Sequence, residues 1–128
     1  MSNLNTIITP KARENMAKAR AGLITLPTIA GMAFGDGGAD EHGDPIPPAS
    51  NQTTLTAELT RKAISSTEMI SNTTCRYKCV LGTSELVGEN ISEIGLYDTE
   101  GDLVCIKTFI PKGKDAETEQ TYVIDDVF

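Results

Sequence analysis

The chain has 128 residues, of which 39% are hydrophobic and none is Trp, and its formal net charge is −7. This length predicts one domain, over residues 1–128, that can bury a core without disulfides or metals. The acidic balance disfavours a nucleic-acid partner, because phosphate binding needs a clustered positive field.

The cysteines and the apolar runs bear on the compartment. Three cysteines leave at least one thiol unpaired, which excludes a disulfide scaffold and favours synthesis in a reducing cytoplasm. No apolar run approaches the roughly 18 residues of a membrane span, and the first residues lack the pattern of a secretory signal. We therefore expect no membrane association and no secretory route.

The positive charge is concentrated near the start of the chain. Residues 1–22 hold four basic residues and one acidic residue, a local +3, so the remainder carries −10. We interpret this segment as a docking arm for an acidic surface, either of a partner or of the chain's own body. Its basic residues are Lys11, Arg13, Lys18 and Arg20.

The segment Thr9–Gly22 predicts a helix. Thr9 suits the N-cap, Pro10 suits the first helical position, and Gly22 fits just past the end. The small residues of one face predict a helix that lies on another surface rather than one that supports a core. We expect residues 1–8 to form a polar arm or an edge strand.

The following residues, 23–128, predict a β-rich body. Residues 23–34 are apolar and β-branched and predict a strand, interrupted or edged at Pro27. Residues 35–52 are crowded with Gly, Asp and Pro and predict a long loop. We expect one helical turn at 53–59 and a strand at 59–69.

The second half of the chain predicts hairpins. Residues 74–81 alternate in polarity, as a half-buried antiparallel strand does. Residues 91–109 predict a hairpin with Gly101 in a left-handed turn, and residues 121–128 predict a last strand. The expected fold class is α+β and β-dominated, with an N-terminal helix followed by an antiparallel sheet or a small β-sandwich.

The acidic residues of the long loop do not match a known metal-binding pattern. The long loop offers possible metal ligands, but they lack the spacing of a calcium loop, and zinc would need more than the single His. Solvated turn chemistry is therefore the favoured interpretation. The residues concerned are Asp36, Asp40, Glu41, His42 and Asp44.

Other reactive residues also have simpler explanations. Cys75 and Cys79 share a face of a predicted strand but lie about 13 Å apart, too far for a disulfide. The adjacent carboxylates Asp125 and Asp126 should point to opposite faces and solvate a sheet end. No Ser or Cys nucleophile has a paired base, so we expect no catalysis and no cofactor.

The stretch "EIGLYDTEGDLVCI", residues 93–106, resembles the signature of the phage tail-collar fibre domain. Three further blocks are similar to that family in the same order: the helix at 9–22, "FGDG" at 34–37 and "LTAELTR" at 55–61. The resemblance implies a structural protein that attaches a fibre, or forms its collar, at the baseplate of a contractile phage or prophage tail. It implies assembly into a virion or phage-like tail after synthesis in the bacterial cytoplasm.

The resemblance also implies partners and an oligomer. The partners are other tail or baseplate proteins, and the expected assembly is a cyclic homo-oligomer with three-fold symmetry, although the residues do not distinguish a trimer from a dimer. The family domain is usually followed by a shaft and a tip, whereas this chain stops near where the domain would end. We therefore expect a stand-alone adaptor or a shortened fibre.

Roles within the signature follow from strand parity. Gly95 leaves one face bare for another backbone or a large side chain, and Glu93 shares that side. We expect Glu93 to accept hydrogen bonds from backbone N–H groups or to pair with Arg61, because a buried carboxylate needs such partners. The full set with expected roles in folding or assembly is Glu93, Gly95, Tyr97, Asp98, Gly101 and Arg61.

Two functions from other classes stay open. A small β-domain that binds a carbohydrate or another ligand is the first alternative, although sugar-binding sites favour the aromatic platforms that are sparse here. A hydrolase is the second, and the single His disfavours it.

Overall fold

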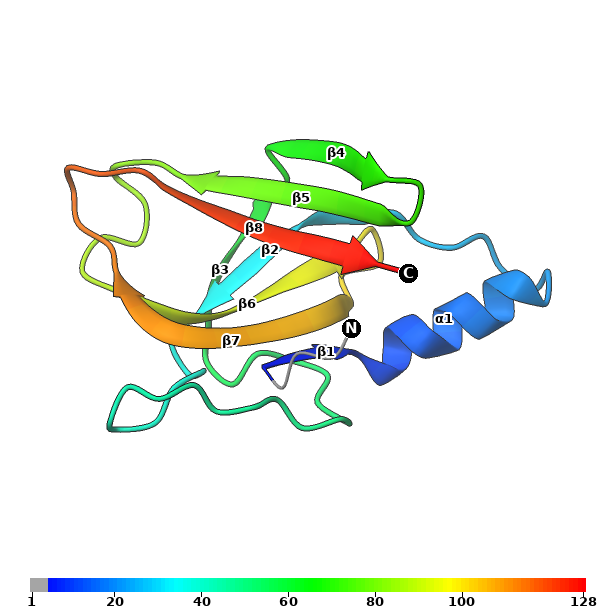
Figure 1. Ribbon diagram of the computed structural model, residues 1–128, viewed down its shortest axis with the longest axis horizontal. Coiled ribbons are helices and arrows are strands. Elements are labelled where there is room, and N and C mark those ends of the chain that lie inside the picture. Colours follow the sequence, from blue (N-terminus) through cyan, green and yellow to red (C-terminus); the bar gives the residue numbers. More distant parts are fainter. Residues whose placement is uncertain (1–4) are drawn as a thin grey trace.

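The computed structural model describes residues 5–128, and it is dominated by strands (Figure 1). One helix, α1 (Pro10–Arg20), follows the short strand β1 (Thr6–Ile8). The remaining strands are β2 (Ile29–Gly35), β3 (Glu58–Ala63), β4 (Ser66–Ser71), β5 (Thr74–Leu81), β6 (Asn90–Asp98), β7 (Leu103–Gly113) and β8 (Gln120–Val127). Residues 1–4, part of the predicted arm, lie outside the described residues.

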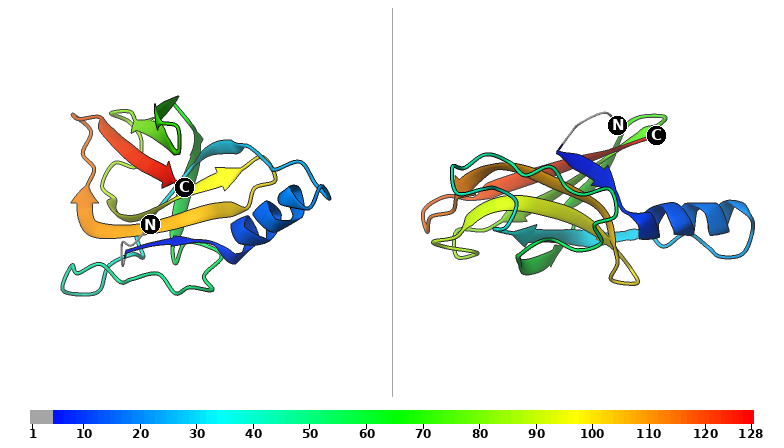
Figure 2. Two further views of the ribbon diagram at one scale, coloured as in Figure 1. Left: turned by 45° about the vertical axis from the view of Figure 1, so that its right-hand side comes forward. Right: turned by 90° about the horizontal axis from the view of Figure 1, so that it is seen from below.

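The strands form two antiparallel sheets. The larger has the order β1-β7-β6-β2-β3, and the smaller has the order β4-β5-β8. The predicted fold class, a β-dominated α+β fold with an N-terminal helix, is confirmed. The two sheets face each other as layers, and α1 extends beyond them at one end (Figure 2).

The core fills the space between the sheets. Phe34 of β2 meets Tyr122 of β8 edge to face, with ring centroids 5.2 Å apart. Ile94 and Leu96 of β6 pack in the same cluster and are almost fully buried. Each such large side chain stabilises the fold by about 1.5–3 kcal/mol on burial. The sandwich is therefore held by aliphatic and aromatic contacts across two layers.

The larger sheet is covered on its other face as well. The long connection between β2 and β3 runs along that face (Figure 1), and its Leu55 packs with Ala33, Leu103 and Ile106. This connection contains no strand or helix between residues 36 and 57, so it is longer than the predicted loop at 35–52. Because of this cover, β6 is buried on both faces along most of its length.

The predicted helix is confirmed together with both of its ends. The Thr9 Oγ1 accepts a hydrogen bond from Ala12 N at 3.2 Å and donates one to Leu103 O at 2.6 Å. The N-cap therefore also fastens α1 to β7. Gly22, with φ of +79°, follows the helix in the left-handed region.

Three sequence expectations for elements are wrong. The strand at 23–34 begins only at Ile29, since Pro27 lacks a donor for a sheet. No helical turn forms at 53–59. The single strand at 59–69 is two strands in different sheets, because Ile64 N donates to Ala30 O and the next amide, Ser65 N, donates to Lys78 O.

Candidate functional site

Glu93 lies in the middle of β6 and is fully buried. Its Oε1 accepts from Thr56 N at 2.8 Å, and its Oε2 accepts from Ala57 N at 2.8 Å and Gly37 N at 2.9 Å. One carboxylate thus holds both ends of the long loop to the sheet. Charge-assisted bonds of this kind are about twice as strong as neutral ones, and they compensate the cost of burying the charge.

Gly35, the last residue of β2, and Gly38 in the following loop make this approach possible. A Cβ on Gly35 would lie 2.6 Å from Glu93 Oε2, and one on Gly38 would lie 2.2 Å from Ser92 O. The freed space lets Gly38 N donate to Ser92 Oγ at 2.9 Å. The run "GDGG" therefore serves a close approach between a loop and a strand, not simply a tight turn.

Arg61 does not contact Glu93, so the ion-pair alternative is wrong. The guanidinium instead binds Glu58 Oε2 at 3.0 Å and donates to Gly101 O at 2.7 Å. It also lies 4.9 Å from the centre of the Tyr97 ring. Arg61 thereby links β3 to the turn of the β6–β7 hairpin.

The β6–β7 hairpin has the geometry that the signature predicted. Asp98 Oδ1 accepts from Glu100 N at 3.0 Å and Asp102 N at 3.1 Å, and Gly101 adopts a φ of +86°. A Cβ on Gly95 would lie 2.7 Å from Cys105 O. The bare face of Gly95 is therefore used by the neighbouring backbone of β7, as expected.

The possible metal ligands of the long loop include a turn built around Asp40. Asp40 Oδ1 accepts from His42 N at 2.9 Å and from Asp44 N at 3.0 Å, while the exposed His42 lies 3.5 Å from Glu41. Among residues 5–128, no group of three or more His, Cys, Asp or Glu could hold a metal ion. Asp36 is exposed beside this loop.

The cysteines are reduced in the structure. Cys75 and Cys79 do not bridge each other, and Cys105 is buried in the core. Burial raises the pKa of Cys105 to about 12, which opposes formation of a reactive thiolate.

The four basic residues of the predicted docking arm lie on α1 and use their charge in different ways. Lys11 and Lys18 bind the two oxygens of Glu14 at 3.2 and 3.3 Å. Arg13 donates to Ser50 O at 3.4 Å. Within the described part of the chain, the Arg20 side chain forms no ion pair or hydrogen bond.

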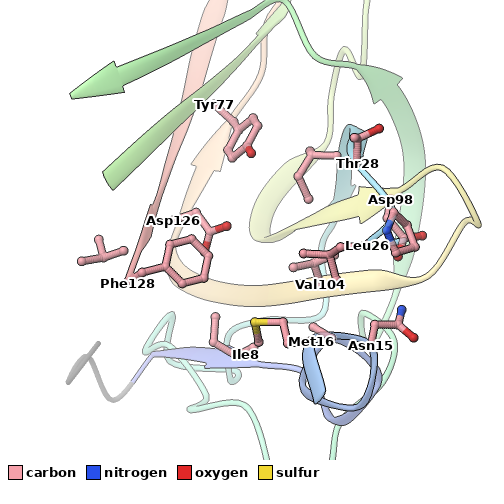
Figure 3. A pocket seen from close by; sticks show the side chains of 14 residues that line it. Ile8, Asn15, Met16, Leu26, Thr28, Tyr77, Asp98, Val104, Asp126 and Phe128 are labelled. Carbon is pink, nitrogen blue, oxygen red and sulfur yellow. The ribbon is translucent and has the colours of Figure 1, made fainter. Parts of the chain in front are cut away.

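A groove with a volume of about 400 Å³ opens between the start of α1 and the end of β8 (Figure 3). Ile8, Met16 and Val104 form one side of it, and Tyr77 and Phe128 form the other. Phe128 is 73% exposed, an unusual fraction for a side chain beside an apolar hollow. The groove is thus a largely apolar surface that nothing in the described chain fills.

Two acidic residues, Asp98 and Asp126, line this groove, and they differ in their partners. Asp98 Oδ1 accepts two backbone hydrogen bonds, whereas the Asp126 carboxylate has no such partner among residues 5–128. Tyr122 and Ile124 point into the core, and the parity of β8 turns Asp126 to the same side. Burial raises the pKa of its carboxyl, and no ion pair or hydrogen bond to any residue from 5 to 128 compensates it. The expectation that this side chain solvates a sheet end is therefore wrong.

The neighbouring Asp125 behaves as the opposite case. It points away from the core and forms a two-pronged ion pair with Arg76, at 2.8 and 3.0 Å. The Arg76 guanidinium lowers the pKa of Asp125. The expected opposition of the two aspartates is confirmed, but sequence reasoning missed the groove that one of them enters.

The comparison with known families decides the identity of the chain. The family described as phage tail-collar fibre protein, N-terminal, matches residues 1–123. The chain belongs to this family. A search against curated proteins finds no match.

Membership in the tail-collar fibre family assigns a structural role in a phage tail. It implies incorporation into a virion and contacts with other tail proteins. Within the described residues, the one helix is too short to cross a membrane.

Proposed function

We propose that the chain attaches a tail fibre, or forms its collar, at the baseplate of a contractile phage or prophage tail. It acts without catalysis and without a cofactor, as one folded unit over residues 1–128. It assembles as a cyclic homo-oligomer, with three-fold symmetry as the expected form. The observation that supports this most directly is the gathering of exposed apolar side chains at the end of the molecule that holds the groove.

Several large apolar side chains near the groove and the end of α1 are exposed to solvent. Leu26, 46% exposed, and Phe128, 73% exposed, line the groove, and Leu23, 74% exposed, lies beyond it near the end of α1. Neighbouring exposed apolar residues that border a groove are typical of a protein–protein contact. A fibre collar holds its partners through such surfaces and requires no reactive group.

The buried acidic residues also support a structural role, because they accept hydrogen bonds from backbone amides. Glu93 uses both carboxylate oxygens on loop amides, and Asp98 uses one on the hairpin turn. We propose that Glu93, Gly95, Tyr97, Asp98, Gly101 and Arg61 act in folding and assembly. Their contacts leave the hairpin and the long loop in fixed positions, as a docking surface requires.

Edge strands add further contact sites. The order of the sheets leaves β1, β3, β4 and β8 with one neighbouring strand each. All six residues of β4 are exposed. Such edges can pair with strands of other chains.

The test is a co-purification of the purified chain with the baseplate and fibre proteins encoded beside its gene, followed by light scattering. We expect a stable complex, and a mass above that of the monomer for the chain alone. Failure to bind any of these proteins would contradict the attachment role. Clear hits on a glycan array would favour the carbohydrate-binding alternative instead.

A further inference from the structure

The free end of α1 and the groove carry side chains of complementary chemistry. The helix extends away from the sheets, so its last turn is held out in solvent (Figures 1 and 2). We define the helix tip as Arg20 and Leu23. Leu23 is 74% exposed, and the Arg20 side chain has no ion pair or hydrogen bond within the described residues. The tip thus offers one apolar side chain beside one free cation.

The groove offers the matching pair of features. Its walls are mainly apolar, and Asp126 supplies a carboxylate that points inward without a partner among residues 5–128. A half-buried charge in apolar surroundings is unfavourable until a counter-charge reaches it. The groove therefore fits an apolar segment that carries a basic residue.

We propose that the occupant of the groove is the helix tip of a second copy of this chain. Leu23 of one copy enters the apolar groove of the next, and Arg20 faces Asp126 there. This inference rests on the homo-oligomer in the proposed function and names its contact surface.

The distribution of charge favours a second copy over an unrelated acidic protein. Residues 1–22 carry +3, whereas the rest of the chain carries −10. A basic tip on one copy meeting an acidic body on another reduces repulsion between like subunits. Arginine also suits such a contact, because its planar fork can bind a carboxylate through two hydrogen bonds.

The symmetry of the assembly follows from the two surfaces that form the contact. The tip and the groove are different surfaces, so the contact is head to tail rather than self-complementary. Head-to-tail contacts form a closed ring when the rotation between copies closes. A cyclic assembly, and not an isolated two-fold dimer, is the form that this contact produces.

The test is charge reversal followed by restoration, measured as mass against concentration by sedimentation equilibrium. Arg20→Asp alone and Asp126→Arg alone should each weaken association by at least about tenfold. The double variant should recover a large part of the loss. A mixture of the two single variants should recover less, because a three-membered ring of two variants keeps one mismatched contact. Lys78→Glu, an equal charge change on β5 outside the helix tip and the groove, should leave association close to wild type.

Leu23→Asp keeps the proposal testable if Asp126→Arg does not fold. Leu23 is exposed in the single chain, so this variant should retain the wild-type melting temperature while it loses association. An oligomer that is indifferent to Arg20→Asp and Leu23→Asp would overturn the proposed contact but leave the homo-oligomer standing. A monomeric wild type would overturn both, while the co-purification still decides the attachment role.

Discussion

Glu93 and Asp126 are two inward-pointing carboxylates in very different surroundings. Glu93 is fully buried and accepts hydrogen bonds from three backbone amides. Asp126 is half-buried beside an apolar groove, and its carboxylate has no hydrogen bond or ion pair within residues 5–128. Glu93, whose hydrogen bonds are satisfied within the chain, stabilises the fold. Asp126, whose carboxylate lacks such partners, lies on the surface that we propose as a contact with another copy.

The largest expected effect is the difference in the free energy of unfolding between Glu93→Ala and Asp126→Ala. Glu93→Ala leaves three loop amides without their acceptor, and each uncompensated group costs about 1–3 kcal/mol. We expect a loss of roughly 3 kcal/mol or more in the free energy of unfolding. Asp126→Ala is the matched control and should change that free energy little. Urea unfolding of both variants measures the difference.

The role of Glu93 in the fold would be contradicted by a stable variant. If Glu93→Ala kept the wild-type melting temperature and oligomer mass, the carboxylate would not hold the long loop. Equal losses in both variants would remove the distinction between the two sites.

The next largest effect on stability is expected at the glycines that let the loop approach Glu93 and Ser92. A Cβ on Gly38 would lie 2.2 Å from the backbone oxygen of Ser92, so the loop must shift away from the sheet. We expect Gly38→Ala to destabilise the fold by about 1–3 kcal/mol. Gly82→Ala is the control, because its Cβ would meet only the end of the Glu85 side chain, at 3.3 Å. Thermal melts of the two variants should differ clearly.

The pH dependence of Asp125 and Asp126 should differ in sign. Arg76 lowers the folded pKa of Asp125, so its contribution is present above the unfolded pKa and is lost as pH falls. Burial raises the folded pKa of Asp126, so its contribution is greatest at low pH and is lost as pH rises through that pKa. The Asp125 effect is small, because an exposed ion pair contributes about 0.2–1 kcal/mol.

The free energies of unfolding of two amide variants, measured in dilute, unassembled protein, test these signs. At neutral pH, Asp125→Asn should lower the free energy of unfolding slightly, and Asp126→Asn should raise it slightly. As pH falls below the unfolded pKa of the carboxyl, each difference from wild type should shrink. The opposite sign for Asp126→Asn would show that its carboxylate is already compensated within the chain.

The local parts of the fold could be predicted because their causes are local. Thr9, Pro10 and Gly22 define the helix through capping and backbone preference, and Asp98 with Gly101 defines the hairpin turn. Strand parity also placed Glu93 beside the bare face of Gly95. These signals require only a few neighbouring residues.

The rest depends on segments that return from far along the chain. The partners of Glu93 lie 36 to 56 residues away, so the sequence indicated that it needs donors but not that both ends of the long loop supply them. The break between β3 and β4 is invisible to local pattern, because Ile64 and Ser65 pair with different sheets. The parity of Tyr122, Ile124 and Asp126 could have placed Asp126 inward, but the groove is lined by residues of α1 and of the end of β8, which lie far apart in the sequence.

Hydrogen–deuterium exchange of the wild-type protein, in dilute and in concentrated solution, tests the account most directly. Exchange reports protection of each segment as the chain assembles. We predict that the segments around Arg20–Ile29 and Tyr122–Phe128 gain protection with concentration, whereas the loop held by Glu93, residues 36–57, is protected equally in both. Protection that rises in the loop and stays constant at the helix tip and the groove would contradict the account.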